Sequence, residues 1–197
     1  MAMPKQRVAV LISGRGSNMA SLIEAAKADD YPAEIVLVVS NRPDAPGLTH
    51  ARNHGIATAV VDHTRYGKDR EAFERALQDV LVAHRIDLVC LAGFMRLLTP
   101  WFVGQWPERM LNIHPALLPA FKGLHTHERA LAAGVKTHGA TVHFVSAEMD
   151  SGPIIAQAEV PVLDGDTPDT LAARVLEAEH RIYPQALRKV AQDRARG

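Results

Sequence analysis

Short apolar runs alternate with amphipathic segments through the first half of the chain. Residues 7–13 (RVAVLIS) form a β-branched run that ends at Gly14, which is typical of a strand buried on both faces. Apolar side chains then recur at helical spacing through Asp29, with Ser17 or Asn18 as the expected N-cap. Because this strand–helix unit repeats, the pattern predicts a parallel sheet with helices on both faces. The further predicted strands cover residues 34–40, 57–62 and 87–91, and the further predicted helices cover residues 45–54 and 69–84.

The pattern changes after Gly93, where prolines become frequent and a loop over residues 114–124 interrupts the alternation. A long irregular segment inside a compact domain is usually functional. Two later strands, 139–145 and 153–162, are separated by a tight turn and should pair antiparallel. We therefore expect residues 1–197 to form a single Rossmann-like α/β domain with a mostly parallel twisted sheet, helices on both faces and an antiparallel strand pair in its C-terminal half. The remaining predicted elements are a brief strand over residues 110–113 and a helix that begins at Pro168, runs past Glu179 and has its expected bend at Pro184.

The composition is that of an ordinary globular chain without charge bias. Of its 197 residues 47% are hydrophobic, and 22 Lys plus Arg balance 22 Asp plus Glu. Zero net charge removes the long-range field that attracts nucleic acid or an acidic membrane. A single cysteine excludes an internal disulfide and multi-cysteine metal patterns. Because no apolar run reaches the ~20 residues of a membrane span or resembles a signal-peptide core, we expect a cytoplasmic protein without nucleic-acid or membrane partners.

The loop Gly14–Asn18 joins the first predicted strand to the first predicted helix. Free backbone N–H groups and the helix dipole favour an anion at such a position. A dinucleotide fingerprint would need a third glycine where Met19 stands, and an acidic residue where the second strand ends in Ser40 and Asn41. We therefore predict that the loop binds a single phosphate group rather than NAD or FAD. On this motif alone, a plain tight turn is the alternative.

Asn112 and His114 lie two residues apart at the end of a predicted strand, so both side chains face the same volume. An amide donor beside an imidazole suits an oxyanion formed at a carbonyl. Asp150, in the turn between the last two strands, would stabilise the imidazolium if those strands pack nearby. A turn residue that bonds its own backbone is the alternative for Asp150. Because Cys90 lies within an apolar strand as an inert core residue, the pattern favours noncovalent acyl transfer or hydrolysis.

Ten histidines raise the question of a metal site. The candidates are His125 with His127 and His138 with His143, but carboxylates at helical spacing from them are sparse. The tighter Cys and His spacing of structural zinc sites is also missing. We therefore predict no metal and interpret these side chains as loop or strand histidines.

Several segments, taken together, resemble the folate-dependent formyltransferases. They follow in order from about Val8 to Pro184 and are LISGRGSN, LAGFMRLL, NIHPALLPAFKG, LHTHERAL, HGATVHFVSAEMDSGPII and EHRIYP. The combination of N-I-H, the LLPAFKG loop and the later D-S-G-P turn is specific, whereas GRGSN alone is weak. The resemblance implies transfer of the formyl group of 10-formyltetrahydrofolate, a cosubstrate, to the amine of N1-(5-phospho-D-ribosyl)glycinamide in de novo purine (IMP) biosynthesis. It also implies direct attack without a covalent enzyme intermediate.

The resemblance further implies a role for each matching residue. The implied catalytic residues are Asn112, His114 and Asp150. The implied ribonucleotide-binding residues are Gly16, Ser17, Asn18 and Glu179. The implied folate-binding residues are Arg70, Met95, Arg96, Leu97, Leu98 and Asn112. The N-terminal half would bind the nucleotide phosphate and the C-terminal half the folate, with the active site between them, in a monomer or a homodimer.

Three other functions share parts of this pattern. Formyltetrahydrofolate deformylase directs water at the formyl group, but that family carries an amino-terminal regulatory domain, which we do not expect before Lys5, and usually has a second histidine where this chain has Pro115. Methionyl-tRNA formyltransferase adds a carboxy-terminal RNA-binding domain, which we do not expect in a chain that stops at Gly197 without basic surplus. A noncatalytic phosphate sensor would require the catalytic constellation to be accidental.

Overall fold

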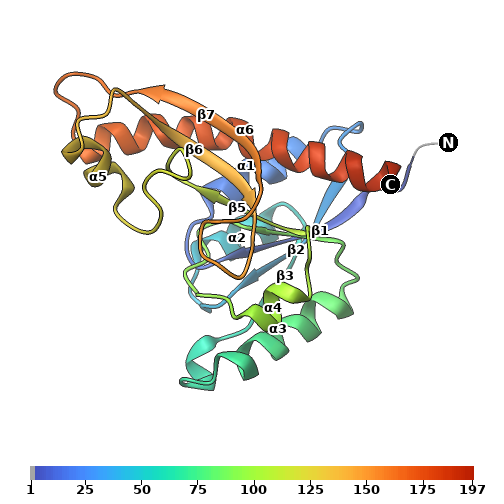
Figure 1. The fold of residues 1–197 in the computed structure, drawn as a ribbon. Helices are drawn as coiled ribbons and strands as arrows, with labels where there is room; N and C mark the ends of the chain where they lie inside the picture. The colour runs from blue at the N-terminus through green and yellow to red at the C-terminus, as the bar shows by residue number, and fades with distance from the viewer. Residues whose placement is uncertain (1–2) are drawn as a thin grey trace.

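One seven-stranded sheet runs through the molecule, as the computed structural model describes it for residues 3–197 (Figure 1). The strands are β1 (Gln6–Ile12), β2 (Ala33–Ser40), β3 (Ala57–Val60), β4 (Leu88–Leu91), β5 (Met110–His114), β6 (Thr137–Phe144) and β7 (Ile154–Pro161). Their order in the sheet is β3-β2-β1-β4-β5-β6-β7. The pairs among β1 to β5 are parallel, whereas β6 is antiparallel to both β5 and β7. The predicted mostly parallel sheet with an antiparallel pair in its C-terminal half is therefore confirmed.

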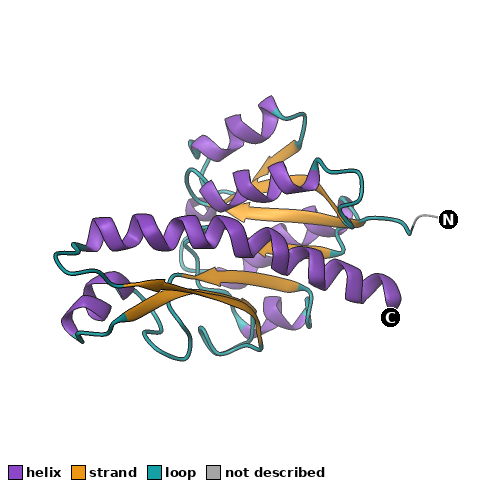
Figure 2. Cartoon of the chain, turned by 90° about the horizontal axis from the view of Figure 1, so that it is seen from above, coloured by secondary structure: helices purple, strands orange, loops and turns teal. Residues whose placement is uncertain are grey.

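Helices cover both faces of this sheet (Figure 2). They are α1 (Ser17–Ala26), α2 (Pro46–Asn53), the 3-10 helix η1 (His63–Tyr66), α3 (Arg70–Ala83), α4 (Pro100–Gly104), α5 (Thr126–Ala132) and α6 (Pro168–Arg196). One apolar core joins a sheet face to α1, α2 and α6 through Leu22, Leu48 and Leu187. A second core joins the opposite face to α3 and α4 through Leu77 and Phe102. No described helix is both long and apolar enough to cross a membrane.

The elements that the hydrophobic pattern did not predict are the short helices η1, α4 and α5. These are too brief to show a helical period, and helices of this length depend on tertiary packing for their stability. The long helix α6 continues through Pro184 over 29 residues. The carbonyl of Pro184 accepts a hydrogen bond from the Tyr31 hydroxyl at 2.7 Å, which joins this helix to the loop before β2.

The strands β4 and β5 pair over a very short stretch. Their parallel register pairs only Val89 with Met110 and Cys90 with Leu111. Beyond it, the buried Tyr183 hydroxyl lies 2.8 Å from the Leu91 carbonyl and 3.1 Å from the Leu111 carbonyl. The hydroxyl therefore bridges the two strands directly before Asn112. Burial raises the pKa of the neighbouring Cys90 thiol to about 12, which agrees with an inert core cysteine.

Candidate active site

Polar side chains occupy one face of the sheet where β5 ends. The antiparallel register places Asn112 opposite His143, and His114 opposite Thr141. Because directly opposite residues of antiparallel strands point to the same face, these four side chains share one surface. The residues between them point the other way, and Leu111, Ile113 and Val142 join the core beneath α6. The two-residue spacing predicted this common face for Asn112 and His114.

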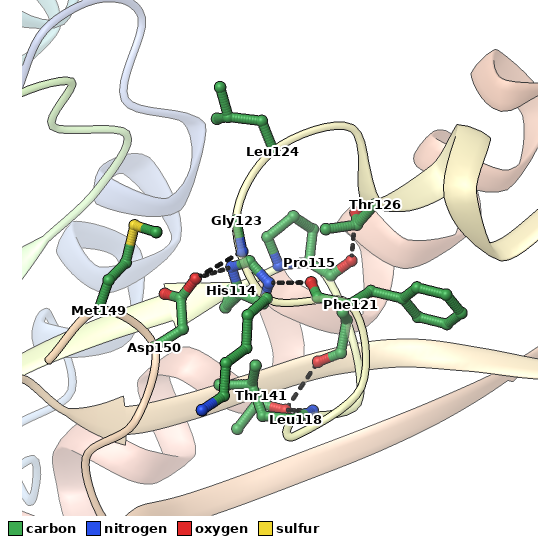
Figure 3. Close-up of polar contacts among 12 residues, drawn as sticks. His114, Pro115, Leu118, Phe121, Gly123, Leu124, Thr126, Thr141, Met149 and Asp150 are labelled. Carbon is green, nitrogen blue, oxygen red and sulfur yellow. Dashed lines mark hydrogen bonds and ion pairs between the residues drawn. The ribbon is translucent and has the colours of Figure 1, made fainter.

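His114 and Asp150 form a buried pair (Figure 3). The imidazole Nδ1 lies 3.6 Å from the carboxylate Oδ2, and the two side chains are only 7% and 8% exposed. Asp150 comes from the turn after β6 and has a φ of 54°, a conformation that few non-glycine residues adopt. Its Oδ2 accepts a hydrogen bond from the distant Gly123 amide at 2.8 Å. The carboxylate therefore faces the site rather than bonding its own turn.

The loop after β5 closes onto both members of this pair. The Phe121 carbonyl lies 2.8 Å from His114 Nε2, and because a carbonyl only accepts, Nε2 carries a proton in this arrangement. Thr141 secures the loop from β6, since its hydroxyl donates to the Ala116 carbonyl at 2.7 Å and accepts from the Leu118 amide at 3.0 Å. Phe121 has a φ of 53°, which is costly for an aromatic residue. The loop is thus held in a strained shape against the imidazole.

His143 is a site residue that the sequence interpretation assigned only to a strand. Its Nδ1 donates to the Phe144 carbonyl at 2.9 Å, while its buried Nε2 has no hydrogen-bond partner and lies 4.0 Å from Asp150 Oδ1. Burial lowers the pKa of His143, although the Phe144 carbonyl and Asp150 oppose that effect. A neutral imidazole therefore flanks the carboxylate. His143 is recognised as a site residue because β6 pairs with β5 in a register that sets it opposite Asn112. That register is a tertiary contact, which the sequence pattern does not reveal.

A second pair of imidazoles lies behind the loop. His127 Nδ1 is 3.2 Å from His138 Nε2. Burial, followed by the nearby His127 and His114, lowers the pKa of His138 to about 4. Burial also lowers the pKa of His127. Over residues 3–197, no group of three or more histidine, cysteine or acidic side chains is arranged to hold a metal ion.

The glycine-rich loop after β1 leads into α1 with a different cap from the one predicted. Gly16 occupies the N-cap position with a φ of 64° and no side chain caps the helix, so the prediction of a Ser17 or Asn18 cap is wrong. The reason is steric, because this left-handed turn favours glycine and a Cβ on Gly16 would lie 3.1 Å from Ile12 Cγ2. The first amides of α1 consequently lack an internal acceptor, as an anion site requires.

The same loop meets α6 through one buried contact. Asn18 Nδ2 donates to Glu179 Oε1 at 3.1 Å, which unites two of the predicted ribonucleotide-binding residues. The Asn18 Oδ1 is buried without a hydrogen-bond partner. Burial raises the pKa of Glu179 to about 7, against the lowering effect of the Asn18 hydrogen bond. Ser17, by contrast, is exposed at the start of α1.

The predicted folate-binding residues lie on three segments, which are β5 with Asn112, the residues after β4, and the start of α3. Met95 and Leu97 point outward after β4 and are 70% and 61% exposed. Leu98 packs on the second core, and the Arg96 guanidinium lies 6.0 Å from the ring of Phe73 on α3. Arg70 begins the same helix one turn earlier and is exposed. No hydrogen bond or ion pair within residues 3–197 joins its side chain to the other candidate residues.

A cavity of about 390 Å³ opens beside these segments. Its lining residues lie just after the carboxyl ends of β1, β2, β3 and β4, and are Ser13, Gly14, Asn41, Arg42, His63, Gly93, Met95 and Arg96. The glycine-rich loop follows β1, the outward apolar segment follows β4, and the imidazole–carboxylate pair lies at the end of β5. Because these three strands are neighbours, their carboxyl ends bring the three features to one edge of the sheet.

An anion-type loop, an apolar segment and a buried acid–base pair at the carboxyl edge define a Rossmann-like α/β enzyme with a proton-transfer site. The chain belongs to the formyl transferase family, which it matches over residues 6–187. This family assignment agrees with the resemblance found in the sequence.

Individual members of the family and one solved structure are similar to this chain over most of its length. The chain is 48% identical over 177 residues to phosphoribosylglycinamide formyltransferase of Escherichia coli, covering 90% of this chain and 83% of that protein. It is 52% identical over 187 residues to the trifunctional purine biosynthetic protein adenosine-3 of Gallus gallus, covering 95% of this chain but only 18% of that protein. The crystal structure of phosphoribosylglycinamide formyltransferase from Brucella melitensis superposes with a TM-score of 0.91 at 55% identity, covering 95% of this chain and 96% of that one.

Proposed function

We propose that this chain transfers the formyl group of 10-formyltetrahydrofolate to the amine of N1-(5-phospho-D-ribosyl)glycinamide. The observation that carries the proposal is the buried His114–Asp150 pair beside Asn112, in a chain 48% identical to an enzyme named for that reaction. The products are the N-formyl ribonucleotide and tetrahydrofolate. The proposed setting is purine biosynthesis in the cytoplasm, with residues 1–197 acting as one domain.

The reaction exchanges one carbon–nitrogen bond for another. The substrate amine bonds to the formyl carbon, the bond from that carbon to N10 of the folate breaks, and the amine proton passes to N10. The intermediate is a tetrahedral carbon that bears an oxyanion. No covalent enzyme intermediate is required, because the substrate amine is itself the nucleophile. Cys90 is buried with a raised thiol pKa, and the Thr141 hydroxyl opposite His114 is occupied by the Ala116 carbonyl and the Leu118 amide.

Asn112 and His114 are the proposed donors to that oxyanion. Both belong to β5, so the strand fixes their relative positions before substrate arrives. The Phe121 carbonyl already accepts from His114 Nε2 at 2.8 Å, as the formyl oxygen would during the reaction. We therefore assign the Phe121 carbonyl to the acceptor position that the substrate takes over. Asp150, on the Nδ1 side, sustains the imidazolium and passes the amine proton to N10 through water.

The substrates are proposed to bind on either side of this pair. The phosphate would bind to the first amides of α1 at Gly16, Ser17 and Asn18, where the helix dipole favours an anion. Glu179, held by Asn18, would contact the ribonucleotide. The folate would lie against the segment after β4 and Asn112, with Arg70 near its acidic end. In this proposal, Arg70 and the segment after β4 contribute to the folate site from the N-terminal half of the chain. The proposed folate-binding segment comprises Met95, Arg96, Leu97 and Leu98.

A spectrophotometric assay tests the proposal directly. Purified protein is given 10-formyltetrahydrofolate, or its dideaza analogue, with and without the glycinamide ribonucleotide. Folate product that forms only with the ribonucleotide supports transfer. Product that forms equally without it would indicate a formyltetrahydrofolate hydrolase, and the absence of product in both conditions would refute both activities.

A further inference from the structure

The segment between β4 and α4 has almost no backbone hydrogen bonding of its own. Residues 92–99 contain no helix or strand. Among the N–H groups of residues 93–99, only two donate to another described group, and both acceptors are side chains from elsewhere in the chain. The Met95 amide donates to Ser13 Oγ at 2.8 Å, and the Thr99 amide donates to Glu74 Oε2 at 2.7 Å. The segment is thus fixed at two points.

Between those points the segment presents apolar side chains to solvent. Phe94 and Leu98 pack inward on the second core, whereas Met95 and Leu97 alternate with them and stand outward. Large apolar side chains exposed beside a cavity commonly contact a ligand. Met95 itself lines the cavity over the strand ends. The position of these two side chains therefore depends on the two anchors.

Ser13 is a buried anchor that is itself held in place. Its hydroxyl lies 2.5 Å from Asn41 Oδ1, to which it donates while it accepts from the Met95 amide. Asn41 Nδ2 in turn lies 3.1 Å from His63 Nδ1. This chain of contacts joins the residues that follow β1, β2 and β3 to the segment after β4. The hydroxyl consequently has one orientation available.

Glu74 is the second anchor, and its burial is costly. It lies on α3 beside Phe73 and Leu77 in the second core and is only 1% exposed. A carboxylate removed from water needs strong compensating partners. Both donors come from Thr99, whose amide and hydroxyl meet the two carboxylate oxygens. No basic side chain of the described residues forms an ion pair with it, so its contacts are directed to this segment alone.

We propose that Ser13 and Glu74 are positioning residues for the formyl donor. They hold the segment between them so that Met95 and Leu97 meet the folate in a set pose, and they act through their hydrogen bonds to the Met95 and Thr99 amides. The inference rests on the proposed function, because it takes this segment as the folate site.

Steady-state kinetics with each substrate varied in turn tests the anchors. Ser13→Ala removes one acceptor, and Glu74→Leu removes the other while keeping an apolar fit to the core. Each variant should raise KM for the formyl donor about tenfold, the effect of losing roughly one hydrogen bond, and change KM for the ribonucleotide less than about twofold. Glu74→Gln should stay within about threefold of the wild type, because its amide offers an oxygen to the Thr99 N–H and a donor to the Thr99 hydroxyl.

Thr167→Ala provides the matched control. Thr167 caps α6 by accepting from the Thr170 amide at 3.2 Å, so its loss removes a comparable side-chain cap far along the chain from the segment. It should lower the unfolding temperature and leave both KM values unchanged. Because Ser13→Ala and Glu74→Leu act at opposite ends of the segment, poor folding of one variant leaves the other to decide.

Two results would overturn the anchoring role. The first is an unchanged KM for the formyl donor in both Ser13→Ala and Glu74→Leu, and the second is an equal rise of both KM values. The proposed function fails separately, when the wild type releases formyl without the ribonucleotide. In that case a raised KM for the formyl donor in both variants still supports the anchors, whereas a wild type without any activity on the donor refutes the function and the anchors together.

Discussion

Glu179 makes the stability of the folded chain depend on pH in a way that can be calculated. Burial raises the pKa of this carboxyl from its ordinary value of 4.5 to about 7. Below pH 4.5 the group is protonated in both the folded and the unfolded chain, so it contributes no pH dependence. Between the two values the unfolded chain releases a proton that the folded chain retains. The free energy of unfolding therefore falls as the pH rises through this window.

The size of this fall follows from the two pKa values. At 1.36 kcal/mol for each pKa unit, the free energy of unfolding falls by about 3 kcal/mol over the whole titration, relative to a chain with no carboxyl at this position. Glu179→Gln removes the titration and keeps an acceptor for Asn18. The difference in unfolding free energy, variant minus wild type, should therefore become more positive by about 2.5 kcal/mol between about pH 5 and about pH 8, because part of the fall lies below pH 5.

Urea unfolding at the two pH values, without ligands, measures this difference. Glu177→Gln is the matched control, because Glu177 lies on the same helix but is exposed. Its variant-minus-wild-type difference should stay within about 0.5 kcal/mol across the range. A Glu179→Gln difference that is equally flat would refute the argument that burial holds this carboxyl in its protonated form.

Three further changes probe the site and its frame. Asn112→Ala and Asp150→Asn should each lower single-turnover transfer by about 10²- to 10³-fold while ribonucleotide binding, measured by calorimetry, stays nearly intact; near wild-type turnover would remove the assigned role. Gly16→Ala should destabilise the chain by about 1–2 kcal/mol and weaken ribonucleotide binding, because a φ of 64° strains alanine and its Cβ crowds β1; unchanged thermal unfolding and affinity would contradict this. Tyr183→Phe should cost about 1–3 kcal/mol in urea unfolding, since the facing carbonyls of β4 and β5 lose their buried donor, and a change below about 0.5 kcal/mol would argue against the bridge.

Local pattern was sufficient for most of the sheet and for part of the site. Apolar runs closed by turn residues indicated the strands, and the alternation of Asn112 and His114 indicated a shared polar face. Those features depend only on residues that are neighbours in sequence, so the local pattern is sufficient to predict them. The imidazole of His143 and the Phe121 carbonyl could not be placed in the same way. Their positions come from the β5–β6 register and from a loop conformation, both of which are decided by contacts between distant residues.

At the N-terminus of α1, the local capping preference gave a wrong prediction. Serine and asparagine are good N-caps in general, yet Gly16 takes that position because the turn needs a positive φ. Asn18 is then released to reach Glu179 on α6. Asn18, whose residue type suggests a cap, therefore makes a tertiary contact instead. Its partner lies 161 residues away, beyond the range of any local pattern.

The long C-terminal helix α6 imposes an order on biosynthesis. It is the last of these elements to leave the ribosome, yet it supplies Glu179 to the first loop and the Tyr183 bridge to the middle of the sheet. Strands β1 to β5 can pair while translation continues, but the core face that receives α6 stays uncovered until the helix emerges. The nascent chain therefore carries a nearly complete sheet before α6 is made, and the Asn18–Glu179 contact and the Tyr183 bridge form only after that helix has emerged.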